Sequence, residues 1–187
     1  MRIFLFAIAA IGLSACAEPQ PEHAAAACSQ TATHNVTWSQ AGAADTITAH
    51  GEGPSCKQAV VTFVARDAAG DPLWTFASTY YDMTVGGAPP EGAPDIAPEE
   101  LQRFLASWAD VTETTSSDLP EWRDGMSRPG EGVEALGYET PFTREVYEAM
   151  RGRGLPTICY AAAVAAVQCL VIDPASHAPT MIVAYGS

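Results

Sequence analysis

Residues 59–81, AVVTFVARDAAGDPLWTFASTYY, decide the fold. Two runs rich in β-branched and aromatic side chains, residues 59–65 and 73–81, flank the segment DAAGDP at residues 67–72. Side chains of this kind pack well on the pleated surface of a strand. The segment between the runs has turn chemistry, because glycine accepts a positive φ and aspartate bonds to nearby backbone amides. The sequence therefore predicts a β-hairpin and, with it, an antiparallel sheet.

Short strands and a helix are predicted on either side of this hairpin. Residues 34–39 and 45–49 alternate apolar and polar side chains, with Gly42 in the turn between them. Downstream, residues 86–98 are rich in proline and glycine, which predicts a loop. Proline suits the first position of a helix, so a helix is expected from Pro98 onward. Its apolar stripe has amphipathic spacing and consists of Leu101, Phe104, Leu105 and Trp108.

A second amphipathic helix is expected to begin near Thr140, whose hydroxyl can cap the first turn. Gly152 and Gly154 are expected to end it. Its predicted buried stripe consists of Phe142, Val146, Ala149 and Met150. Between the two helices, residues 110–139 are acidic and aperiodic, which predicts a long loop that is either functional or mobile.

The apolar residues 157–172 allow two interpretations. In one, the chain folds back near Val164 as a hairpin and places Cys159 opposite Cys169. In the other, the segment is a single long buried strand, or a small helix at its alanines. Residues 173–179 then form a turn and residues 180–185 a final strand. We therefore predict one α+β domain over residues 28–187, with an antiparallel sheet of about five or six strands and two amphipathic helices.

The N-terminus has the pattern of an export signal. Arg2 precedes an apolar run at residues 3–12, which is shorter than the roughly 20 residues that a transmembrane helix needs. Leu13-Ser14-Ala15-Cys16 resembles the lipobox of bacterial lipoproteins, a likeness confined to the first 16 residues. The resemblance implies cleavage after Ala15, a diacylglycerol thioether on Cys16 and acylation of the new amino group. Residues 1–15 are thus expected to be a signal peptide and residues 16–27 a lipidated flexible tether.

The resemblance also implies a location. Several acyl chains anchor a protein durably, whereas a single chain binds a bilayer only marginally. Ala17, rather than aspartate, follows the lipidated cysteine. In the Gram-negative pattern this favours the periplasmic face of the outer membrane over retention in the inner membrane.

Four further cysteines, Cys28, Cys56, Cys159 and Cys169, indicate two disulfides, because an even number in an oxidising compartment reads as a disulfide framework. Three connectivities are open. The pairs Cys28–Cys56 and Cys159–Cys169 are favoured because each joins nearest neighbours in sequence. No Cys-x-x-Cys spacing occurs, so neither a metal site nor a redox centre is expected, and no cofactor is predicted.

Charge limits the classes of partner. The net charge is −13, and removing residues 1–15 with Arg2 leaves 8 − 22 = −14. This balance opposes binding to nucleic acid or to an anionic lipid surface. It permits a cationic protein or ligand.

The sequence contains no nucleophile elbow, zinc-binding helix motif or phosphate loop. Residues 82–139 hold 13 acids and 3 arginines, which is interpreted as a solvated acidic surface. His34 and His50 are interpreted as exposed strand-end side chains, with a facing metal or acid–base pair as the alternative. Trp122, with Glu121 and Asp124 beside it, is the candidate partner contact; the alternative is a buried tryptophan that pins the loop.

These observations favour a non-enzymatic, membrane-anchored envelope lipoprotein that binds another macromolecule through an acidic face. A periplasmic hydrolase or sugar-binding protein using the acids of residues 110–139 is one alternative. An inhibitor of a basic hydrolase is another, by analogy of charge and compartment.

Overall fold

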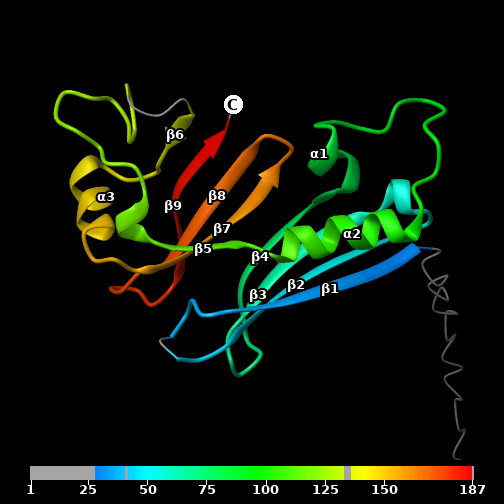
Figure 1. The fold of residues 1–187 in the computed structure, drawn as a ribbon, viewed down its shortest axis with the longest axis horizontal. Helices are drawn as coiled ribbons and strands as arrows, with labels where there is room; N and C mark the ends of the chain where they lie inside the picture. Colours follow the sequence, from blue (N-terminus) through cyan, green and yellow to red (C-terminus); the bar gives the residue numbers. More distant parts are fainter. Residues whose placement is uncertain (1–27, 41, 133–135, 187) are drawn as a thin grey trace, which may run out of the picture.

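The computed structural model describes residues 28–40, 42–132 and 136–186, so the predicted signal peptide and tether lie outside it. The first of its two antiparallel sheets has four strands in sequence order (Figure 1). They are β1 (Cys28–Val36), β2 (Asp45–Gly53), β3 (Val60–Arg66) and β4 (Pro72–Thr79). The predicted hairpin is confirmed as β3–β4, where Phe63 pairs with Phe76. In its turn, the Asp67 carboxylate accepts hydrogen bonds from the amides of Ala69 and Asp71.

The second sheet has five strands in the order β5-β7-β8-β9-β6. Their bounds are β5 (Thr112–Thr115), β6 (Gly137–Glu139), β7 (Pro156–Ala163), β8 (Ala166–Ile172) and β9 (Pro179–Gly186). The hairpin interpretation of residues 157–172 is confirmed, since β7 and β8 place Cys159 opposite Cys169. The interpretation as a single strand or a small helix is wrong.

The helix α2 (Pro98–Ala109) lies across the first sheet, packed against β1 and β2 (Figure 1). Leu101, Leu105 and Trp108 are buried as predicted, and Phe104 is half-buried. Three shorter helical turns complete this set: α1 (Tyr80–Thr84) and the 3-10 helices η1 (Cys56–Gln58) and η2 (Ser116–Asp118).

The helix α3 (Arg144–Arg151) differs from its prediction in two respects. It starts after Thr143 rather than near Thr140, because the Thr140 hydroxyl instead donates to the carbonyl of Ile182 on β9. Its buried residues are Tyr147 and Met150, whereas Val146 is 44 % exposed. The predicted stripe was therefore wrong at Val146 and at Ala149, which is also exposed, since Tyr147 takes the place toward the core.

The α+β fold class is confirmed, although the described residues form nine strands in two sheets rather than one sheet of five or six. Part of the difference comes from β5 and β6, which occupy the ends of a segment expected to be a loop. Their residues become strands by pairing with the edges of β7 and β9. Such pairing depends on distant partners and leaves little local pattern in so short a segment.

The second sheet forms a middle layer with apolar contacts on both faces. Ile158, Tyr160 and Leu170 belong to the core that also contains the first sheet and α2. Cys169, Val171 and Ile182 belong to a second core with Tyr147 of α3. Since side chains alternate between the faces of a strand, a sheet covered on both sides needs a continuous apolar run. This explains why residues 157–172 are apolar apart from Thr157 and Gln168.

Three tryptophans join the first part of the chain to this middle layer. The Trp38 indole N–H, beyond the end of β1, donates to the Leu170 carbonyl at 3.2 Å. The Trp108 indole on α2 donates to the Ala161 carbonyl at 2.8 Å, and the Trp74 indole on β4 donates to the Tyr160 hydroxyl at 3.0 Å. Aromatic rings fill the space between, as where Phe63 stacks on Tyr160 with centroids 4.7 Å apart.

Both favoured disulfide pairings are confirmed. Cys28 at the start of β1 is bonded to Cys56 in η1, with their Cα atoms 5.1 Å apart. Cys159 and Cys169 are bonded directly across β7 and β8, with a Cα separation of 4.0 Å. The first bond closes a loop with a sequence separation of 28 and the second a loop with a separation of 10.

Removing the Cys28–Cys56 disulfide, which closes the longer loop, is expected to cost more stability than removing Cys159–Cys169. Replacing both Cys28→Ser and Cys56→Ser should lower the free energy of unfolding by about 3–4 kcal/mol, and Cys159→Ser with Cys169→Ser by about 3 kcal/mol, because each bond restricts the unfolded chain. Equilibrium denaturation of the two double variants measures both values. Unchanged stability in the first double variant would contradict this account of the bond.

Candidate functional site

Side chains of α3 form hydrogen bonds to the backbone of residues 119–124. This segment contains the predicted partner-contact residues Glu121, Trp122 and Asp124. The Arg151 side chain donates to the Leu119 carbonyl at 2.8 Å, and the Tyr147 hydroxyl donates to the Pro120 carbonyl at 2.7 Å. The remaining bonds fix both backbone groups of Trp122. Its amide donates to Glu148 at 2.6 Å, and its carbonyl accepts from Arg144 at 2.8 Å.

This grip follows from helical spacing. Arg144, Tyr147, Glu148 and Arg151 stand at positions i, i+3, i+4 and i+7, so they share one face of α3. Burial raises the pKa of the Tyr147 phenol, which keeps its hydroxyl protonated as a donor. The segment is therefore fixed by charge-assisted and buried hydrogen bonds and not by apolar packing alone.

The side chains of the segment have different environments. Trp122 is half-buried, its ring centroid lies 6.2 Å from that of Tyr147, and its indole N–H donates to the Met126 carbonyl at 2.9 Å. These contacts agree with the alternative in that Trp122 pins the loop, but its side chain is half-buried rather than buried. Asp124 is 94 % exposed and forms an ion pair with Arg144, while Glu121 is exposed. Contact of these residues with a partner stays a prediction.

Several acids of residues 110–139 bond within the protein. Asp110 lies 3.6 Å from His34, and Glu113 accepts the Thr37 amide at 2.9 Å. Hydrogen bonds from Thr115 lower the pKa of Asp118, and those from Ser127 lower the pKa of Glu131. Across the described ranges, no group of three or more His, Cys, Asp or Glu side chains is placed to hold a metal ion.

The alternative of a facing His34–His50 pair is wrong. The strands do pair, but His34 stands opposite Ile47 and His50 opposite Thr31. Thr31 and His34 are three residues apart on β1, so they project from opposite faces of the sheet. His50 bonds with Thr31 at 2.8 Å and lies 3.3 Å from Glu52.

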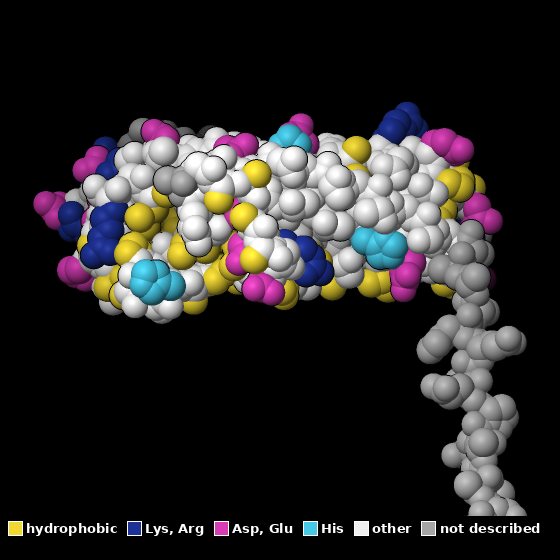
Figure 2. All heavy atoms as spheres, turned by 90° about the horizontal axis from the view of Figure 1, so that it is seen from below, with side chains coloured by type: hydrophobic (Ala, Val, Ile, Leu, Met, Phe, Trp, Pro, Cys, Tyr) yellow, Lys and Arg dark blue, Asp and Glu magenta, His cyan; other side chains and the backbone are white. Residues whose placement is uncertain are grey.

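A groove of about 360 Å³ opens between α3 and the turn joining β8 to β9. We call it the α3 groove; its apolar wall consists of Phe142, Val146, Ala149 and Met150. Figure 2 shows hydrophobic side chains gathered at the end of the molecule that carries α3, with Lys or Arg side chains at their edge. The wall is the stripe predicted to be buried in the core. Its pattern was visible in the sequence, but only the packing of Tyr147 and Met150 into the core shows that Val146 and Ala149 face outward.

The rim of the α3 groove is charged. Glu145 and Arg153 stand on the α3 side, and Asp173 stands on the facing turn. Backbone hydrogen bonds lower the pKa of both carboxyls, through the amide of Glu145 itself and the amide of Ala175 for Asp173. Both acids are therefore ionised at neutral pH.

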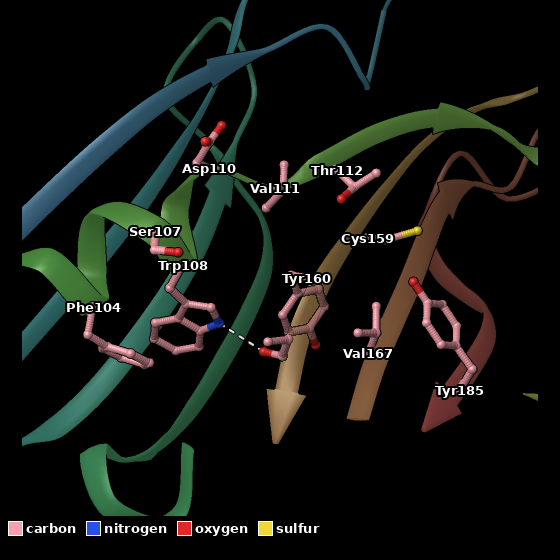
Figure 3. A pocket seen from close by; sticks show the side chains of 11 residues that line it. Phe104, Ser107, Trp108, Asp110, Val111, Thr112, Cys159, Tyr160, Val167 and Tyr185 are labelled. Atoms are coloured by element: carbon pink, nitrogen blue, oxygen red, sulfur yellow. Dashed lines mark hydrogen bonds between the residues drawn. The ribbon is translucent and has the colours of Figure 1, made fainter. Parts of the chain in front are cut away.

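A second cavity of about 220 Å³ lies where α2, β5 and β7 meet (Figure 3). We call it the α2 hollow. Its lining includes the aromatic residues Phe104, Trp108, Tyr160 and Tyr185 and the hydroxyl residues Ser107 and Thr112. Among the aromatic residues of this set, the sequence identified Phe104 and Trp108, both as members of the apolar stripe of the first predicted helix. No local signal links Tyr160 and Tyr185 to that helix, because they lie on strands far from it in the chain.

No helix within the described ranges is long and apolar enough to cross a membrane. Comparison with known proteins finds no matching family model, no similar characterised protein and no similar solved structure. The chemistry of the α3 groove and of the α2 hollow is therefore the basis for inferring a function.

The hold of α3 on residues 119–124 can be tested through one hydroxyl. Tyr147→Phe should lower the free energy of unfolding by about 1 kcal/mol, because the Pro120 carbonyl loses its donor. Local hydrogen exchange at the Trp122 amide should rise severalfold, as measured by mass spectrometry. Tyr185→Phe on β9 serves as the control, because the Tyr185 hydroxyl makes no hydrogen bond to residues 119–124. Equal exchange in both variants would show that the Tyr147 hydroxyl does not hold the segment.

Proposed function

We propose that the protein is a lipid-anchored binding protein of the bacterial envelope that captures another protein at its α3 end. The observation that carries the proposal is the α3 groove, where an amphipathic stripe remains uncovered and leaves Val146 44 % exposed. Apolar surface with a polar rim is the arrangement that marks protein interaction sites. We interpret the α3 groove as a binding surface that a partner protein covers.

The position of Cys28 supports an orientation in which the α3 end of the protein is accessible to a partner. β1 begins at Cys28 at one end of the longest axis, and α3 lies at the other end (Figure 1). A lipid on Cys16 would attach through residues 16–27, which span at most about 40 Å when extended. The α3 end would then face away from the anchoring membrane, where a partner could approach it. The two disulfides support an oxidising compartment such as the periplasm.

Charge supports a cationic partner. On the rim of the α3 groove the two ionised acids, Glu145 and Asp173, outnumber the one cation, Arg153, and the exposed Glu121 lies on the nearby segment of residues 119–124. A partner with an apolar side chain set in a basic surface matches this arrangement, and charge complementarity would also speed encounter. Inhibition of a basic hydrolase is one form that such binding could take.

Two acids of residues 110–139, Asp118 and Glu131, are poorly suited to hydrolysis as general acids. Asp118 and Glu131 accept hydrogen bonds inside their own loops, and their pKa values are lowered. A general acid needs the opposite, a raised pKa that keeps its proton near neutral pH. These two carboxylates are therefore better suited to holding loops than to donating protons.

The proposed lipid anchor on Cys16 can be tested on the protein isolated from its membrane. The protein isolated from its native membrane should begin at Cys16 and carry acyl groups, which intact-protein mass spectrometry detects. Cys16→Ser should release the chain from the membrane fraction. Retention of Met1, or an unmodified sulfur at position 16, would contradict the anchor.

Photo-crosslinking tests whether the α3 groove is where the partner binds. A photo-reactive benzoylphenylalanine placed at Val146 in the full, lipidated chain should give a covalent adduct of discrete mass with another protein. The same group at Thr75, exposed on the outer face of the first sheet, is the control and should give none. Adduct yield at Val146 should fall severalfold as salt rises, because salt screens exposed charges. Equal adducts at both positions, or none at Val146, would refute the α3 groove as the site of capture.

A further inference from the structure

Two uncharged loops meet beside α1. Residues 85–90, VGGAPP, follow α1, and residues 162–166, AAVAA, contain the turn from β7 to β8. A Cβ atom added at Gly86 would lie 3.2 Å from a methyl group of Val164, so the two loops are in close contact. Figure 1 likewise shows α1 next to the β7–β8 turn. We call these two loops the apolar tip, because every residue in them is valine, alanine, glycine or proline.

The apolar tip exposes its largest side chains to solvent. Val85 is 63 % exposed and Val164 is 55 % exposed, the highest values among the large hydrophobic residues that the structure describes. The neighbouring Ala88, Pro89 and Ala165 are also exposed. Exposed loop tips usually carry small or polar residues, and a contiguous apolar surface marks contact with another protein or with a membrane.

The position of Cys28 favours a membrane over a protein. Cys28 is bonded to Cys56 in η1, and η1 packs against α1. Residues of η1 and of the apolar tip also line one hollow. A tether over residues 16–27 spans at most about 40 Å, so acyl groups on Cys16 would keep the apolar tip close to the bilayer. This step rests on the lipid anchor of the proposed function.

The chemistry of the apolar tip suits lipid without help from charge. The whole chain has a net charge of −13, which opposes attraction to anionic lipid. The apolar tip has no ionisable side chain, so contact with a bilayer would depend on burial of apolar surface. Two valines bury little surface by themselves, so the contact would form only while the acyl groups hold the protein at the membrane.

We propose that the apolar tip inserts into the interface of the anchoring bilayer, with Val85 and Val164 below the headgroups. The insertion is a second contact beside the lipid on Cys16. It fixes an orientation that a flexible tether alone leaves open. Because α3 lies at the other end of the longest axis, this orientation leaves the α3 groove accessible to a protein partner (Figure 1).

Fluorescence quenching in vesicles tests the insertion. Val164→Cys in the full, lipidated chain is labelled with an environment-sensitive dye, and the protein is reconstituted at low density in phosphatidylcholine vesicles with a nitroxide near the top of the acyl chains. The nitroxide should quench this dye severalfold more than a dye on Val146→Cys, an exposed valine at the α3 end. High salt should leave the quenching unchanged, because the contact is apolar.

A second variant separates the apolar tip from the anchor. With the dye on Ala88→Cys, adding Val85→Asp and Val164→Asp should abolish the quenching, while the chain still sediments with the vesicles. Both valines are exposed, so the unfolding midpoint should not change.

Three results would overturn the insertion of the apolar tip. They are equal quenching at Val164 and Val146, quenching that survives both aspartates, and a blue-shifted dye at Val164 that the nitroxide does not quench, which would indicate a protein at the apolar tip. In each case the chain would sediment with the vesicles. A chain that failed to sediment would contradict the lipid anchor of the proposed function, and with it the insertion.

Discussion

Three indole N–H groups hold the first sheet and α2 against the second sheet. Trp38, Trp74 and Trp108 come from three separate elements, and each donates to β7 or β8. The Trp38 bond is buried and the other two are part-buried. An indole N–H removed from water without an acceptor costs free energy, so the register that supplies all three acceptors is favoured. The relative placement of the two sheets therefore depends on these bonds together with the surrounding apolar contacts.

Both candidate sites follow from that placement. The α2 hollow exists because Trp108 docks the end of α2 on β7, next to the start of β5. Because the first sheet and α2 occupy one face of the second sheet, α3 is left to cover the other face with Tyr147. This leaves Val146 and Ala149 turned toward the α3 groove. The same layering thus produces a closed core and two open surfaces of different chemistry.

Local patterns predicted the elements that depend on local chemistry. The hairpin β3–β4, the stripe of α2 and both disulfide pairs follow from turn residues, helical spacing and proximity in sequence. The outward face of Val146 could not be predicted, because an eight-residue helix with apolar side chains on two sides is oriented by what packs against it. The α2 hollow is lined by residues from Phe104 to Tyr185, which come together only after folding. The register of β1 and β2 likewise places His34 and His50 on opposite faces of the sheet, whereas the sequence allowed a facing pair as an alternative.

Native-state hydrogen exchange of Trp38→Phe tests the coupling of the two sheets most directly. In the unmodified protein, the slowest amides of β3 and β8 should open with the same free energy, as parts of one cooperative unit. Removing the Trp38 indole leaves the buried Leu170 carbonyl without this donor and should lower both opening free energies together, by about 1–3 kcal/mol. If β8 kept its protection while β3 lost it, or if the sheets opened separately in the unmodified protein, the indole bonds would not be what holds the two layers together.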